Sequence, residues 1–210
     1  MPAGFVRTLI GRNMSSCRDH IVGILLAAGK GTRFDAQGRR NKLLQRIEGG
    51  NPVAAAAAAA LLPALEQVVA VVRDDGDALA EELRSCGCAL LPCAQADQGM
   101  AASIVAGLRH TADAAGWIIA LGDMPYVETE TIAALAAALQ DGADIAVPIY
   151  QGKRGNPVGF SRRHLPALLR LEGDRGARDL LHACPVTAII VDDAGVLRDI
   201  DTAQDLPYTN

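Results

Sequence analysis

Short apolar runs recur along the chain, with stretches of helical patterning between them. The runs predict buried strands at residues 21–27, 68–72, 89–91, 117–121, 145–148 and 186–191, because a strand covered on both faces lacks polar alternation. The intervening stretches predict helices at 52–65, 77–85, 100–114, 129–140 and 161–182, the last interrupted at Gly173. A final run at 196–200 follows a turn and predicts a short antiparallel strand at one edge.

Strands that alternate with helices are typical of parallel strands joined by right-handed crossovers. We therefore expect an α/β fold: a single Rossmann-like domain, with a mostly parallel sheet and helices on both faces. Residues 1–20 have no periodicity and predict a flexible N-terminal leader, so the domain is expected at 21–210. The alanine tract 54–60 predicts a helix packed closely on the sheet, because alanine combines high helix propensity with small volume.

Composition narrows the classes of function. The chain has 210 residues and a net charge of −4, which suits one domain and gives no basic surplus for binding nucleic acid. No apolar run has the length and character of a membrane span. The 5 cysteines are scattered and no signal peptide is recognisable, so we expect a reducing, cytoplasmic location. Small-molecule chemistry, with neither nucleic acid nor membrane as partner, is the expectation that follows.

A glycine-containing loop directly follows the first predicted strand, where an open α/β sheet places its ligand. Gly29 and Gly31 allow the backbone to approach a ligand and to present N–H groups to it. Three cations, Lys30, Arg33 and Lys42, surround this loop. Backbone amides with Lys and Arg are what a triphosphate requires. An ordinary glycine turn with solvated basic residues is the alternative.

The same loop argues against a dehydrogenase. The dinucleotide-binding fingerprint needs a third glycine three residues after the second, and that position is Phe34.

Two carboxylates are candidate metal ligands. Asp123 follows the strand that ends near Gly122, and a carboxylate at that edge can hold Mg²⁺ against phosphate oxygens. The alternative is that Asp123 only caps the turn before the helix at 129. Asp201, at the end of the last apolar run, is the candidate for the second ligand, while Asp199 is expected to be solvated.

A helix N-cap is predicted directly after Asp201. Thr202 and Asp205 have the spacing of a capping box, which indicates a structural role for these two residues.

Five motifs occur in order along the chain: Leu-Ala-Ala-Gly-x-Gly-x-Arg with the later Lys42, then Gly-Asp-Met-Pro at 122–125, Arg-Gly-Asn-Pro at 154–157, Gly-Asp-Arg-Gly-Ala-Arg at 173–178 and Asp-Ile-Asp-Thr at 199–202. Together they resemble the MobA-like NTP transferases, and within these most closely the MocA-type molybdenum cofactor cytidylyltransferases. The resemblance extends over about residues 21–206.

This resemblance implies a nucleotide-diphospho-sugar transferase-like fold and an enzyme that uses Mg²⁺. Its small-molecule substrates would be an NTP and a phosphorylated acceptor, with CMP passing from CTP to molybdopterin and pyrophosphate released. The Ala-Ala-Gly form of the loop resembles cytidylyl enzymes, whereas guanylyl enzymes show Ala-Gly-Gly. Alternatives are a GTP-dependent pterin enzyme, a transferase for a sugar or alditol phosphate, and a nucleotide- or pterin-binding chaperone-like module. A molybdoenzyme or its chaperone is the partner that the resemblance suggests.

The resemblance also assigns roles to residues. Catalytic roles fall to Lys30, Arg33, Lys42 and Asp123, and metal binding to Asp123 and Asp201. Nucleotide binding falls to Leu26, Ala27, Ala28, Gly29, Lys30, Gly31, Arg33, Lys42, Gly99 and Ser103. Acceptor binding falls to Arg154, Gly155, Asn156, Pro157, Asp174 and Arg178.

One departure from the family pattern motivates the chaperone-like alternative. Asp35 stands where the family has a small residue, which would bring a negative charge near the expected triphosphate.

Overall fold

The computed structural model describes residues 20–35, 37, 39–174 and 176–206, so nearly all of the predicted leader lies outside the described residues. The strands are β1 (Ile21–Leu26), β2 (Gln67–Val72), β3 (Ala89–Pro92), β4 (Gly116–Leu121), β5 (Ile145–Tyr150), β6 (Lys153–Arg154), β7 (Val158–Ser161) and β8 (Thr187–Ile190). The α-helices are α1 (Val53–Leu61), α2 (Ala78–Cys86), α3 (Met100–His110), α4 (Thr129–Gln140), α5 (Leu165–Leu168) and α6 (Arg178–Ala183). Short 3₁₀ helices are η2 (Lys42–Leu44), η3 (Ala96–Gln98), η4 (Arg162–His164), η5 (Ala194–Leu197) and η6 (Ala203–Asp205).

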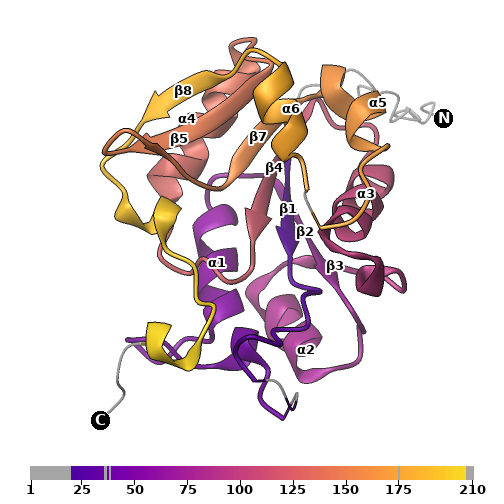
Figure 1. The fold of residues 1–210 in the computed structure, drawn as a ribbon, viewed down its shortest axis with the longest axis vertical. Coiled ribbons are helices and arrows are strands. Elements are labelled where there is room, and N and C mark those ends of the chain that lie inside the picture. The colour runs from indigo at the N-terminus through magenta and orange to yellow at the C-terminus, as the bar shows by residue number, and fades with distance from the viewer. Residues whose placement is uncertain (1–19, 36, 38, 175, 207–210) are drawn as a thin grey trace, which may run out of the picture.

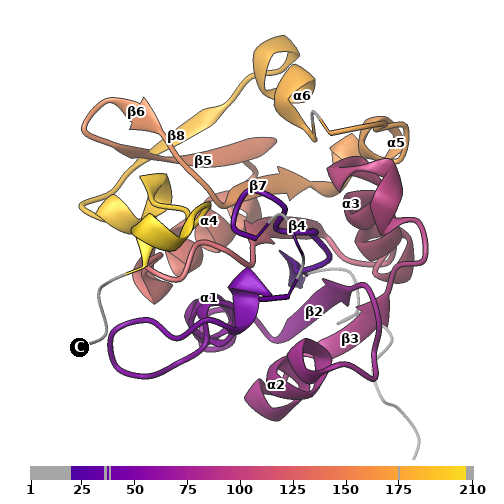
Figure 2. The same cartoon turned by 60° about the horizontal axis from the view of Figure 1, so that its bottom comes forward.

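The described strands form one mixed sheet in the order β3-β2-β1-β4-β7-β5-β6, and β8 also pairs with β5. Figure 2 shows them as a twisted row from β3 to β8. Strands β1 to β4 pair in parallel, whereas β7 runs antiparallel between β4 and β5. The chain after β1 moves outward to β2 and β3 and then returns to β4 on the other side of β1. This reversal is the point at which an open α/β sheet opens a crevice for a ligand.

Two apolar layers cover the sheet, which confirms helices on both faces (Figure 1). Helices α1, α2 and α4 pack on one face together with Leu25, and α3, α5 and α6 pack on the other together with Ile24. Successive residues of β1 therefore point to opposite layers, as the pleat of a strand requires. The alanine tract lies within α1 as predicted, and Ala54 and Ala58 are fully buried. No helix in the described part of the chain is long and apolar enough to cross a bilayer.

The helix predicted over 161–182, interrupted at Gly173, forms only as short pieces: η4 and α5 cover 162–168, and α6 covers 178–183. The chain from 158 to 161 forms β7, which pairs with β4 and buries Phe160 in the core. This strand precedes the predicted helix and overlaps it only at Ser161, and the sequence pattern did not predict it. Between α5 and α6 the chain turns at Gly173 and Gly176, whose φ values of +67° and +57° lie outside the helical region.

The edge strand predicted at 196–200 is also wrong, because η5 and an extended connection occupy this segment. Its conformation is fixed by tertiary contacts. Gly195 lies so close to the backbone of Tyr126 that a Cβ on it would fall 1.9 Å from the Tyr126 carbonyl oxygen. Asp193 is buried and accepts hydrogen bonds from the backbone N–H groups of Gly195 and Glu128 and from the Thr131 hydroxyl. These contacts of Asp193 and Gly195 therefore anchor the segment that leads to Asp201.

Candidate active site

A cavity of about 450 Å³ opens at the carboxyl ends of β1 and β4. Most of the residues predicted to bind the nucleotide line it, namely Leu26, Ala28, Gly29, Lys30, Gly31, Arg33, Lys42, Gly99 and Ser103. Ala27, predicted with them, is buried in the apolar layer beneath α1. Both predicted metal ligands also line this cavity.

The loop after β1 is shaped by backbone hydrogen bonds. Ala27 N–H donates to the Val71 carbonyl at 2.9 Å, which continues the β1–β2 pairing beyond the end of the strand. Gly31 has a φ of +62°, a backbone conformation that residues with a Cβ rarely adopt. Its carbonyl accepts from the N–H groups of Phe34 and Asp35, which closes a tight turn at the rim of the cavity.

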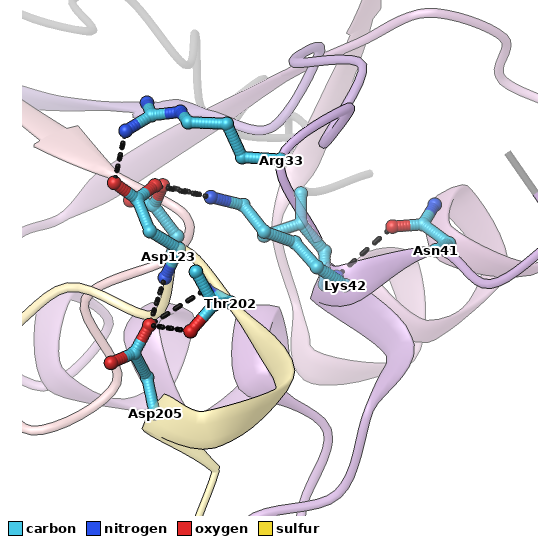
Figure 3. Close-up of polar contacts among 8 residues, drawn as sticks. Arg33, Asn41, Lys42, Asp123, Thr202 and Asp205 are labelled. Carbon is cyan, nitrogen blue, oxygen red and sulfur yellow. Dashed lines mark hydrogen bonds and ion pairs between the residues drawn. The ribbon is translucent and has the colours of Figure 1, made fainter. Parts of the chain in front are cut away.

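Asp123 and Asp201 converge on one ammonium group. Lys42 Nζ donates to Asp123 Oδ2 at 2.6 Å and to Asp201 Oδ1 at 3.4 Å. Arg33 pairs with the other oxygen of Asp201. Figure 3 shows the Lys42 ammonium directed at Asp123. The Lys42 side chain is only 12% exposed, so this ion pair is largely shielded from water.

The C-terminal segment brings Asp201 to this place. Ile200 N–H donates to the Asp123 carbonyl at 2.9 Å, which joins the backbones of the two acidic segments. The predicted capping box is confirmed, because the Asp205 carboxylate accepts from the Thr202 N–H and hydroxyl (Figure 3). These hydrogen bonds from Thr202 lower the pKa of Asp205. Asp199 is exposed, as expected.

The acidic pair fits a divalent cation. Asp123 Oδ1 is buried and has no hydrogen-bond partner among the described residues, so one carboxylate oxygen remains available. No group of three or more His, Cys, Asp or Glu side chains suited to a metal occurs in the described ranges. Two carboxylates are enough for Mg²⁺ in a nucleotide site, since this ion usually takes its other ligands from water and phosphate.

A second ion-pair cluster includes two further residues of the cavity wall, Lys30 and Asp97. Lys30 Nζ lies 3.1 Å from Asp97 Oδ1, and Arg73, just after β2, pairs with the same carboxylate. The hydrogen bond from Lys30 is the main cause that lowers the pKa of Asp97. Asp97 lines the cavity but was not predicted from the sequence. Its position two residues before Gly99, which was predicted to bind the nucleotide, could have indicated that Asp97 lies near the site.

The carboxylate of Asp35 is engaged by its own loop. It accepts hydrogen bonds from the backbone N–H groups of Gln37 at 3.0 Å and Arg40 at 2.8 Å. These bonds lower its pKa, with the bond from Gln37 the largest cause. Asp35 is not one of the residues that line the 450 Å³ cavity.

The residues predicted to bind the acceptor are only partly brought together. A second cavity of about 140 Å³ adjoins the first and is lined by Asn156, Asp174 and Arg178. Asp174 lies on the boundary of both cavities, and its Oδ1 accepts from Met100 N–H at the start of α3 at 3.2 Å.

The other three residues predicted for the acceptor lie elsewhere. Pro157 lines a small cavity beside α1. Arg154 is exposed and Gly155 is buried against Val196, and neither lines either of the two larger cavities.

A mostly parallel sheet, with a glycine loop, basic side chains and paired carboxylates at its strand reversal, is typical of enzymes that act on phosphorylated nucleotides. Comparison with known proteins agrees. The chain belongs to the MobA-like NTP transferase domain family, whose profile matches residues 23–188. It is therefore a nucleotidyltransferase by family.

Three relatives illustrate this membership. The purine catabolism protein PucB of Bacillus subtilis is 30% identical over 199 residues, which cover 89% of this chain and 94% of PucB. The molybdenum cofactor guanylyltransferase of Cupriavidus necator is 30% identical over 200 residues, which cover 90% of this chain and 96% of the relative. The manganese complex of Rv0371C from Mycobacterium tuberculosis superposes with a TM-score of 0.71 at 26% identity, covering 90% of this chain and 96% of that one. A divalent metal is thus present in one structural neighbour.

Proposed function

We propose that this protein transfers CMP from CTP to the phosphate of molybdopterin and releases pyrophosphate. The observation that carries the proposal is the convergence of Lys42, Asp123 and Asp201 at one end of a cavity that continues along the glycine loop. The Ala27-Ala28-Gly29 sequence supports CTP through its resemblance to cytidylyl enzymes. The relative from Cupriavidus necator supports a molybdenum cofactor acceptor.

The proposed reaction is an in-line displacement at the α-phosphorus. An oxygen of the acceptor phosphate forms the new bond to phosphorus, and the bond to the bridging oxygen of the β-phosphate breaks. The main task of the protein is then to position the reactants and to neutralise charge. Lys42, Arg33 and the N–H groups of the glycine loop would hold the phosphates and stabilise the departing pyrophosphate.

Asp123 and Asp201 would hold the divalent cation, which we propose to be Mg²⁺. When bound, such an ion withdraws charge from phosphate oxygens and makes the phosphorus a better electrophile.

The second cavity is the proposed acceptor site. Its wall combines apolar side chains, among them Val158 and Phe160, with the guanidinium of Arg178 and the amide of Asn156. Such a surface suits a flat heterocycle that carries polar and anionic groups. Because the two cavities share Leu26, Leu121 and Asp174 in their walls, the two substrates would lie next to each other.

GTP is the second candidate nucleotide, because the similar protein of Cupriavidus necator is a guanylyltransferase. A sugar or alditol phosphate remains an alternative acceptor. The Asp35 carboxylate accepts hydrogen bonds from its own loop, so its charge gives less reason to propose a non-catalytic chaperone-like module. A molybdoenzyme or its chaperone as partner remains a prediction.

Pyrophosphate release tests the proposal directly. Each NTP is incubated with and without molybdopterin, in the presence of Mg²⁺, Mn²⁺ or EDTA. We expect release to require CTP, molybdopterin and a divalent cation together. If pyrophosphate is released with GTP and with no other nucleotide, the base that the enzyme selects is guanine and not cytosine. Absence of release under every condition, with nucleotide still bound, would instead support a binding module.

A further inference from the structure

The Lys42 ammonium lies where a divalent cation shared by Asp123 and Asp201 is expected. Lys42 Nζ is 2.6 Å from one carboxylate and 3.4 Å from the other. Both Asp side chains are mostly buried, with exposed fractions of 21% and 25%. The lysine therefore neutralises part of the charge of the acidic pair.

A lysine in this position opposes metal binding. A divalent ion that approached these carboxylates would meet an acidic pair that already has its counter-ion, and it would lie beside a positive charge. Like charges at such separations repel strongly where water is partly excluded. The carboxylates therefore become good metal ligands only when the ammonium moves away.

Lys42 has an alternative partner close by. Its stem runs along the glycine loop, because a Cβ built on Gly31 would lie 3.6 Å from Lys42 Cγ and 3.8 Å from Cδ. Rotation about the outer bonds of this flexible side chain can carry the ammonium from the carboxylates toward that loop. A triphosphate bound along the loop would present a dense negative charge there.

We propose that Lys42 is an internal counter-ion that keeps the divalent cation site closed until a nucleotide draws the ammonium away. Cation and nucleotide then bind cooperatively, because each takes over the partner that the other releases. The nucleotide part of this inference rests on the proposed function. The competition between Lys42 and the cation does not.

Mn²⁺ titration of the nucleotide-free protein, followed by electron paramagnetic resonance, tests the competition. The variant Lys42→Met should bind Mn²⁺ at least about tenfold more tightly than the wild type. Lys42→Arg keeps the positive charge, so this variant should bind Mn²⁺ as weakly as the wild type. Lys153→Met, which alters an exposed lysine of β6, should leave Mn²⁺ affinity unchanged.

Two further variants keep the test decisive. Lys42→Gln retains a polar end near the carboxylates and should also bind Mn²⁺ more tightly, which covers the case of an unstable Lys42→Met protein. The gain should vanish in the double variant Lys42→Met/Asp123→Asn if the new affinity arises at this site. The proposal is overturned if neither uncharged variant that folds binds Mn²⁺ more tightly than the wild type, or if the gain survives loss of Asp123.

Nucleotide binding in the absence of metal tests whether the phosphates compete with the carboxylates for Lys42. In EDTA, Asp123→Asn should bind CTP at least several-fold more tightly than the wild type, because the phosphates no longer compete with Asp123 for Lys42. Unchanged or weaker binding contradicts this competition between phosphates and carboxylates. If no variant binds any nucleotide, the proposed function fails, whereas the Mn²⁺ comparison still decides the role of Lys42.

Discussion

At the residue scale, the candidate site is a set of ion pairs. Lys30, Arg33 and Lys42, the three cations near the glycine loop, each contact an aspartate that lines the same cavity. The sequence predicted the cations from the glycine loop and the later Lys42, and it predicted Asp123 and Asp201 from the apolar runs that precede them. It could not predict the pairings. Arg33 and Asp201 are 168 positions apart, and only the folded chain brings them together.

Loss of one proposed metal ligand should nearly stop the proposed reaction without unfolding the protein. Asp123→Asn is expected to lower kcat for pyrophosphate release by about a hundredfold or more, because an amide oxygen is a poor substitute for a carboxylate at a divalent cation. The measurement is steady-state pyrophosphate release, with circular dichroism as the check on folding.

Asp199→Asn is the matched control for this variant. Asp199 is an exposed carboxylate close to Asp201 in sequence, and its loss should leave kcat near the wild-type value. Equal effects of the two substitutions would contradict a specific role for Asp123.

At the element scale, the local sequence pattern correctly predicted those strands and helices whose conformation is set by their own residues. Strands β1 to β5 and helices α1 to α4 lie close to their predicted positions, because each is a long apolar run or a clear helical stretch. The strand β7 was missed and the segment 196–200 was predicted wrongly, because distant partners decide their conformation: β4 and β5 for β7, and the segment around Tyr126 for η5. The helix predicted over 161–182 forms only as the short η4, α5 and α6.

Asp193 is the residue that joins η5 to α4. It is 2% exposed, and its carboxylate lies at the N-terminus of α4, where the helix dipole favours negative charge. Asp193→Ala leaves the Thr131 hydroxyl and two backbone N–H groups without this acceptor. We expect the free energy of unfolding, measured in urea, to fall by about 2–4 kcal/mol.

Its exposed neighbour provides the control. Asp192→Ala should change the free energy of unfolding by no more than about 0.5 kcal/mol. A similarly small change for Asp193→Ala would show that the buried carboxylate contributes little to anchoring the segment before Asp201.

At the scale of the whole molecule, two apolar layers share one sheet. Strand β1 contributes Leu25 to one layer and Ile24 to the other, so the layers cannot separate without breaking its pairing with β2 and β4. This arrangement agrees with the alternation of strands and helices in the sequence. The single domain that the alternation predicts leads to a direct test.

Unfolding in urea should be one cooperative transition. Trp117 is the single tryptophan of the chain, and it is fully buried in the layer beside α3. Its fluorescence should therefore follow the same curve as far-UV circular dichroism, which reports on helices in both layers. Two separate midpoints would indicate that the layers unfold independently.

The antiparallel direction of β7 affects how the substrate preference of such a molecule could change. Since β7 opposes β4, its first residues lie next to the carboxyl ends of the parallel strands, and Asn156 enters the wall of the second cavity from there. The connection from β5 through β6 to β7 thus supplies part of the proposed acceptor site while contributing nothing to the glycine loop. Changes in the length or composition of that connection would reshape the choice of acceptor and leave the machinery for the nucleotide as it is.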